Sequence, residues 1–181
     1  FLRRSFKPLD TSVTKYYWSV IAFLSLFVTF VLIAQGGYTS FGKALLDSSF
    51  QVVSFISTTG FGQADNASWP FLANLMLMFA AFHCGCSGST TGGVKADRVL
   101  MAIREGRNEM YRKLYPSSVI KTKLNGMIVR NEAVSSAALF IVVYVLMLLM
   151  SFILSMVCGL DVGDAFTGTL ASLGNVGPGM G

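Results

Sequence analysis

The chain has 181 residues, of which 53% are hydrophobic and only 13% are charged, and its formal net charge is +5. Soluble domains carry about 25% charged residues, so this composition argues against an ordinary water-soluble enzyme. The same hydrophobicity excludes intrinsic disorder, and three cysteines are too few for a disulfide framework. We therefore expect an all-α integral membrane protein.

Two uncharged stretches are long enough to cross a membrane, which takes about 20 mostly apolar residues. The first, 16–34, follows a cytoplasmic lead-in over 1–15 and begins with aromatic residues typical of a membrane interface. The second covers 133–158. All but one of the 14 Lys and Arg residues fall on one side of this topology, which is cytoplasmic by the positive-inside rule. The topology explains the net charge without any nucleic-acid partner.

Each span is followed by a moderately apolar segment too short to cross the membrane, over 43–56 and 162–173. Each short segment ends in a glycine-rich turn, which reads STTGFG at 57–62 and GNVGPG at 174–179. This order predicts a re-entrant pore helix followed by an extended return, twice in one chain.

The first unit continues into a helix that we expect to be broken, over 70–115. Its apolar part would reach about 21 Å, which is short of the hydrocarbon core of about 30 Å. The small and glycine residues of 84–93 then predict an intramembrane loop, which is tolerated only inside protein or beside a water-filled cavity. Beyond it, apolar residues at helical spacing predict a helix leaving the membrane; they are Val99, Ile103, Met110 and Leu114.

The segment 116–132 is predicted to be a cytoplasmic linker that contains a short β-hairpin. Alternating residues flank Asn125-Gly126, and this dipeptide is a strong signal for a two-residue hairpin turn.

The glycine-rich turns suit the coordination of a dehydrated cation. Successive backbone carbonyls can face one axis only if the backbone visits positive φ, which glycine allows. The carboxyl end of a pore helix adds a partial negative charge. Carboxylates near the outer mouth would raise the local cation concentration; they are Asp47, Asp65, Asp161 and Asp164.

Three motifs together resemble the Trk/Ktr/HKT potassium transporter superfamily, and in particular its bacterial TrkH- and KtrB-type membrane subunits. They are STTGF at 57–61, GCSGSTTGGVK at 85–95 and GNVGPG at 174–179. The resemblance implies four potassium-channel-like units around one pore. On that template the chain is a C-terminal half fragment, with the third unit over 16–115 and the first half of the fourth over 133–181.

The resemblance also implies roles for individual residues. Carbonyls of a selectivity filter would bind potassium at Thr58, Thr59, Gly60, Phe61, Asn175, Val176 and Gly177. The gating loop would include Gly85, Gly88, Gly92, Gly93 and Lys95. The two filter turns are unequal, so we expect some sodium passage beside potassium. No organic cofactor is expected in this chain.

The family further implies a multi-pass protein of the bacterial plasma membrane that performs no covalent chemistry. Its expected partners are a second copy in a homodimer, a cytoplasmic ring of nucleotide-binding regulatory subunits, and membrane lipid. Two alternatives stay open: the potassium-binding subunit of a potassium pump, and a non-conducting membrane scaffold. Lys95 has its own alternative, an interfacial lysine that snorkels.

Overall fold

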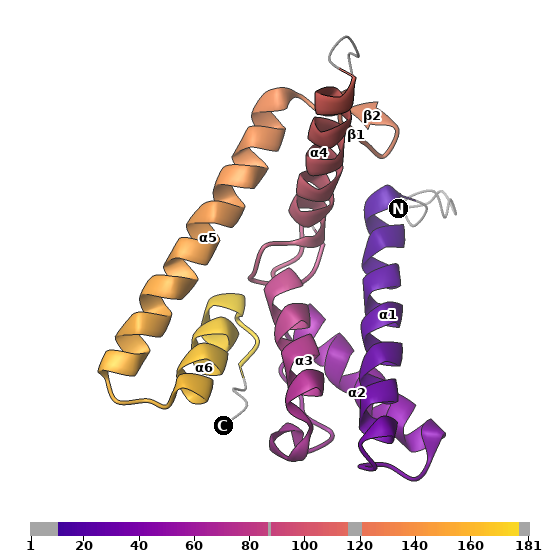
Figure 1. Ribbon diagram of the computed structural model, residues 1–181, viewed down its shortest axis with the longest axis vertical. Helices are drawn as coiled ribbons and strands as arrows, with labels where there is room; N and C mark the ends of the chain where they lie inside the picture. The colour runs from indigo at the N-terminus through magenta and orange to yellow at the C-terminus, as the bar shows by residue number, and fades with distance from the viewer. Residues whose placement is uncertain (1–10, 87, 116–120, 178–181) are drawn as a thin grey trace, which may run out of the picture.

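The computed structural model describes residues 11–86, 88–115 and 121–177 (Figure 1). Its elements in chain order are α1 (Ser12–Ala34), α2 (Phe41–Ser57), the 3-10 helix η2 (Asn66–Ser68), α3 (Phe71–His83), α4 (Ala96–Leu114), β1 (Lys123–Leu124), β2 (Met127–Ile128), α5 (Asn131–Val157) and α6 (Val162–Gly174). The chain is therefore mostly helical, as expected. The lead-in over 1–10, the first part of the linker at 116–120 and the end of the second turn at 178–181 lie outside the described residues.

Two helices, α1 and α5, are long and apolar enough to cross a membrane. Helix α1 begins four residues before the predicted span, because the side chain of Thr11 caps it by accepting a 3.2 Å hydrogen bond from the backbone N–H of Thr14. In its most apolar window α1 is 39% buried, whereas α5 is only 11% buried. Helix α5 contacts α4 and α6, and its remaining apolar surface suits lipid or further protein.

The core forms where α1, α2 and α3 pack together, and α3 also contacts α6 (Figure 1). Leu24, Val28 and Leu77 are at most 1% exposed. A pair of hydroxyls also links α1 to α2, since Thr29 and Ser48 lie 2.5 Å apart and both bond the carbonyl of residue 25. This packing fixes the direction in which α2 ends.

Helix α4 extends away from the core toward the hairpin (Figure 1). Leu100 and Met101 are buried, but three members of the predicted apolar stripe are more than half exposed; they are Ile103, Met110 and Leu114. The apolar residues recur at helical spacing, but no described element covers these three side chains.

The predicted hairpin is confirmed. Strands β1 and β2 pair antiparallel, with Leu124 opposite Met127. Asn125 and Gly126 have φ values of 52° and 79°, as a type I′ turn requires. The strands are only two residues long, shorter than the alternation suggested. The Asn125 side-chain oxygen also accepts a 2.9 Å hydrogen bond from the backbone N–H of Ser12, which ties the turn to the start of α1.

Candidate functional site

The first predicted filter begins where α2 ends. Thr58 takes the left-handed conformation, with φ 57° and ψ 32°. Its N–H bonds the Phe55 carbonyl at 3.2 Å, and the next N–H, that of Thr59, reaches back to Ser54 at 3.0 Å. These two bonds form a Schellman motif, which is usually built on glycine. Gly60 then has φ 70°, so positive φ recurs at alternate residues.

The end of α6 repeats this geometry. Asn175 has φ 54° and ψ 35°. Its N–H bonds Ser172 at 3.2 Å, and the N–H of Val176 bonds Ala171 at 2.9 Å. Gly177 follows with φ 102°. The two sequence turns therefore share one backbone design, in which a helix stops at a left-handed residue and the chain runs on with alternating φ sign.

Two polar residues inside α2 hold the first turn in place. The Ser54 hydroxyl donates a 2.7 Å hydrogen bond to the carbonyl of Phe61, and the Gln51 amide donates a 2.8 Å bond to the carbonyl of Ala64. Both side chains are buried. Neither residue was predicted to support the turn, although two polar residues three apart in an apolar helix share a face, which is a usable signal.

The predicted filter residues differ in what their carbonyls already contact. Within the described part of the chain, no hydrogen bond reaches the carbonyls of Thr58, Thr59 or Gly60. The carbonyl of Phe61 is bonded to Ser54, and its ring is 71% exposed. In the second turn the Val176 side chain is buried, so only the backbone of this residue could contact an ion.

The glycine-rich loop between α3 and α4 is held by its own hydroxyls. Ser89 and Thr91 lie 2.6 Å apart, oxygen to oxygen, and Thr91 accepts a 3.2 Å bond from the N–H of Gly85. A Cβ on Gly85 would lie 2.8 Å from the Thr91 hydroxyl. Gly88 has φ 87° with open space around it. The loop is therefore compact rather than loose.

This loop packs against the end of α6. A Cβ on Gly92 would lie 2.5 Å from the Gly174 carbonyl oxygen, and a Cβ on Gly174 would lie 3.3 Å from the Ala81 carbonyl. Gly93, with φ 67°, leaves the same kind of room for the Cys84 side chain. The structure thus brings the predicted gating loop into direct backbone contact with Gly174, the first residue of the second turn.

Lys95 closes the loop at the start of α4. Its Nζ donates a 3.0 Å hydrogen bond to the carbonyl of Ser89. Its φ of 72° is unusual for a residue with a side chain. The ammonium group therefore folds over the loop instead of extending away from it.

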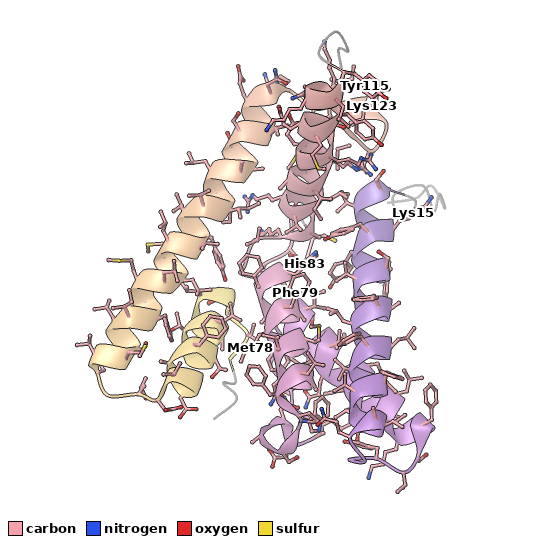
Figure 2. All side chains as sticks on the ribbon, in the orientation of Figure 1. Lys15, Met78, Phe79, His83, Tyr115 and Lys123 are labelled. Carbon is pink, nitrogen blue, oxygen red and sulfur yellow. The ribbon has the colours of Figure 1, made fainter. Side chains whose placement is uncertain are left out.

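His83 links the last turn of α3 to α1, and Figure 2 shows it between these helices. The ring is 1% exposed. Nδ1 lies 3.2 Å from the Cys84 carbonyl and Nε2 lies 3.0 Å from the Tyr16 hydroxyl. Because a carbonyl can only accept, Nδ1 carries the proton, and in a neutral ring Nε2 accepts from Tyr16.

Three of the four carboxylates expected at an outer mouth have structural partners. Asp47 is 6% exposed and accepts a 2.8 Å hydrogen bond from the Tyr38 hydroxyl. Asp65 caps η2 and Asp161 caps α6 through backbone N–H groups. Across residues 11–86, 88–115 and 121–177, no three His, Cys, Asp or Glu side chains are grouped to hold a metal ion.

These features define a mostly helical protein with two helices long and apolar enough to cross a membrane, two alike helix–turn segments and a loop packed against one of them. The profile of the TrkH family, described as cation transport proteins, matches residues 11–181. The chain belongs to this family. The two apolar helices and the family together make it a membrane protein of a transporter family rather than an enzyme family.

Individual relatives agree. The Trk system potassium uptake protein TrkH of Vibrio parahaemolyticus is 33% identical over 178 residues, covering 92% of this chain and 36% of that protein. The Escherichia coli K12 protein of the same name is 33% identical over 158 residues, covering 87% and 33%. The crystal structure of the potassium transporter TrkH from Vibrio parahaemolyticus matches with a TM-score of 0.86 at 31% identity, covering 93% and 36%. The chain spans about a third of the length of these relatives.

Proposed function

We propose that this chain forms part of a potassium uptake protein and supplies two segments of its selectivity filter. The first segment uses the backbone carbonyls of Thr58, Thr59 and Gly60, with Phe61 held at its end by Ser54. The second uses Asn175, Val176 and Gly177. The observation that carries the proposal is the shared backbone design of the two turns, with positive φ at residues 58 and 60 and again at 175 and 177.

The chemistry of the turns supports cation binding. Alternating φ sign turns successive carbonyls toward one side, and carbonyl oxygens can replace the hydration shell of an ion. Both turns follow the carboxyl ends of helices, α2 and α6, where the helix dipole is negative. Thr58 stands where the second turn has Asn175, so the two segments are unequal and we expect a filter that passes some sodium.

The glycine-rich loop is proposed as the gate. It includes Gly85, Gly92 and Gly93, which leave no room for a Cβ, and Gly88, which has positive φ. The contact of Gly92 with Gly174 means that a displacement of the loop acts directly on the second turn. The bond from Lys95 to Ser89 holds one end of the loop to the start of α4. Movement of α4 would therefore be transmitted to the gate.

The proposed assembly is a homodimer in the bacterial inner membrane, in contact with lipid, with a nucleotide-binding regulatory ring on its cytoplasmic side. The part of the chain from the start of α4 to the start of α5 carries most of the basic residues on that side. The family name of the relatives supports potassium as the cargo.

Rubidium uptake in cells that lack their own potassium uptake tests the proposal. The complete gene product that contains this sequence is expressed with Gly60→Ser, Gly177→Ser or Gly36→Ser. Gly36 is the matched control, because its φ of 72° equals that of Gly60 within 2° but its surroundings are open and lie in the loop after α1. All three substitutions carry the same kind of backbone penalty, roughly 1–2 kcal/mol.

Loss of uptake, or gain of sodium uptake, with Gly60→Ser and Gly177→Ser but not with Gly36→Ser supports the filter. Equal effects of all three would mean that stability alone is measured and would overturn the placement. Absence of uptake by a well-expressed protein, with its regulatory partner supplied, would favour the scaffold. Uptake that requires an ATP-hydrolysing subunit would favour the pump.

A further inference from the structure

A basic cavity lies on the cytoplasmic side, apart from the proposed ion path. It has a volume of about 410 Å³ and sits between α4 and the segment that leads into β1. Its lining consists of Leu100, Ile103, Arg104, Arg107, Asn108, Lys121 and Lys123. Four of these side chains are cationic and none is a carboxylate, so the lining favours an anion.

The secondary structure places the cations around one space. Arg104, Arg107 and Asn108 are three and four residues apart and share a face of α4. Lys121 and Lys123 are two residues apart in an extended segment, so they point to the same side. Figure 2 shows Lys123 on the hairpin beside α4. A 2.8 Å hydrogen bond from the Asn108 amide to the Thr122 hydroxyl, both buried, holds the two walls together.

The charges are positioned but not neutralised. Arg104 donates a 2.5 Å hydrogen bond to the Lys123 carbonyl, which fixes its guanidinium at the wall and leaves other N–H donors for a ligand. The nearby carboxylate of Glu105 bonds Thr122 and Arg112 instead. Among the described residues, no ion pair joins a carboxylate to Arg104, Arg107 or either lysine of the lining. Four like charges repel one another, and a bound anion would relieve this repulsion.

The cavity lies at the membrane surface. Its deepest residue, Leu100, packs with Val13 in the first turn of α1, just before the aromatic residues at which the apolar span begins. Arg107 lies about 10 Å further along α4, whereas the headgroup layer is roughly 5–8 Å thick on each side of the bilayer. Ile103, which is 55% exposed, adds apolar surface on the same face as Leu100. Arg104, about 6 Å from Leu100 along α4, therefore stands at headgroup depth above an apolar floor, and Arg107 stands just beyond that depth, from which its long side chain can reach back to the headgroups.

We propose that this cavity binds the phosphate headgroup of an anionic phospholipid from the cytoplasmic leaflet. The two arginines would bond phosphate oxygens, for which the guanidinium fork is suited. The two lysines would add point charge, and the glycerol and upper acyl carbons would lie on Leu100 and Ile103. The site is independent of the filter, so it holds whether or not the protein carries potassium.

Native mass spectrometry of the complete protein in detergent tests the site. The protein is titrated with phosphatidylglycerol, with phosphatidylcholine and with inorganic phosphate. The test variant is Arg107→Gln with Lys121→Gln. The control is Lys113→Gln with Arg130→Gln, which removes the same charge outside the cavity; Lys113 is about 13 Å from Arg104 along α4, beyond a Debye length of about 8 Å.

One phosphatidylglycerol should bind more tightly than phosphatidylcholine, and the test variant should weaken it about 30-fold. The control should change the affinity less than about threefold. Equal loss in both double variants would overturn the site, because only general surface charge would then be measured. Displacement of the lipid by millimolar inorganic phosphate would overturn the lipid and assign the cavity to a free anion. If the test variant kept its lipid affinity but no longer bound an acidic partner protein, the cavity would be assigned to that protein. If the double variant does not fold, the single substitution Lys121→Gln, at an exposed residue, is used for the same comparison of phosphatidylglycerol affinity.

Discussion

The backbone of Gly92 lies directly against the backbone of Gly174, although one belongs to the glycine-rich loop and the other ends α6. A Cβ on Gly92 would be 2.5 Å from the Gly174 carbonyl oxygen and 2.7 Å from its carbonyl carbon. Backbone atoms cannot swing aside as a flexible side chain does, so a larger residue must separate the loop from the second turn.

Gly92→Ala is therefore expected to change rubidium uptake by the complete protein at least about tenfold, the equivalent of about 1.4 kcal/mol. Gly106→Ala is the control. It lies within α4, a Cβ there would meet no atom within 4 Å, and alanine favours the helix by up to about 1 kcal/mol. Unaltered uptake with Gly92→Ala would show that the loop contact does not affect conduction.

Cys84 and Gly93 should be energetically coupled. A Cβ on Gly93 would collide with the Cys84 sulfur and lie 2.8 Å from its Cβ. Cys84 itself has φ 51° and ψ −164°, a conformation that suits glycine. Gly93→Ala should lower the thermal unfolding temperature, and adding Cys84→Gly should recover part of the loss, with a coupling of about 1–2 kcal/mol. Strictly additive effects of the two substitutions would contradict the contact.

Ser54→Ala should reduce ion selectivity without removing uptake. The Ser54 hydroxyl holds the Phe61 carbonyl at 2.7 Å, and a hydrogen bond of this kind contributes about 1 kcal/mol. We expect the rubidium-to-sodium uptake ratio to fall about fivefold. Ser49→Ala is the matched control, because among the described residues the Ser49 hydroxyl bonds only the Leu46 carbonyl of its own helix. Equal rubidium-to-sodium uptake ratios in both variants would show that the Ser54 hydrogen bond does not contribute to selectivity.

Tyr16→Phe should destabilise the packing of α1 on α3. It removes the hydroxyl that lies 3.0 Å from Nε2 of the buried His83 ring and leaves that nitrogen without its partner. The expected cost is about 1–3 kcal/mol of unfolding free energy. Tyr17→Phe, whose hydroxyl bonds nothing within the described part of the chain, should cost clearly less in the same melting experiment. A larger loss of unfolding free energy with Tyr17→Phe than with Tyr16→Phe would mean that His83 has another partner.

The hairpin should loosen from α4 in acid. The Thr122 hydroxyl and the Arg112 guanidinium lower the pKa of the Glu105 carboxyl, against an opposing effect of burial. A lowered folded-state pKa gives stability that is present above the unfolded value, about 4.3, and is lost as the pH falls through the folded value. The protection of the β1 and β2 amides against hydrogen exchange, measured relative to their intrinsic exchange rate at each pH, should therefore fall below about pH 4. Glu105→Gln should abolish this dependence, and Glu132→Gln, at the start of α5, should keep it.

Local patterns were sufficient for the helices and the hairpin. The apolar runs define α1 and α5, and Asn125-Gly126 defines the turn, because each depends on residues close in sequence. The family was visible in three short motifs, and the profile match over 11–181 confirms it.

Long-range contacts were not predictable in this way. Nothing near Asp47 indicates that Tyr38 and the packing of α2 bury it, and nothing near Gly92 indicates the backbone of α6 beside it. The left-handed conformation of Thr58 was also missed, because threonine rarely takes it. In this chain the conformation follows from the Schellman bonds that end α2. These features depend on how helices meet, which one sequence does not specify locally.

The hydrogen bond between Ser12 and Asn125 can form only late in the synthesis of this part of the chain. The two partners are 113 residues apart, which at 5–20 residues per second corresponds to about 6–23 s of synthesis. During that interval α2, α3 and α4 all leave the ribosome, while the N–H of Ser12 has only water to bond. The Ser12 end of α1 is therefore tied down only after α4 has been made, by a turn that emerges just before α5.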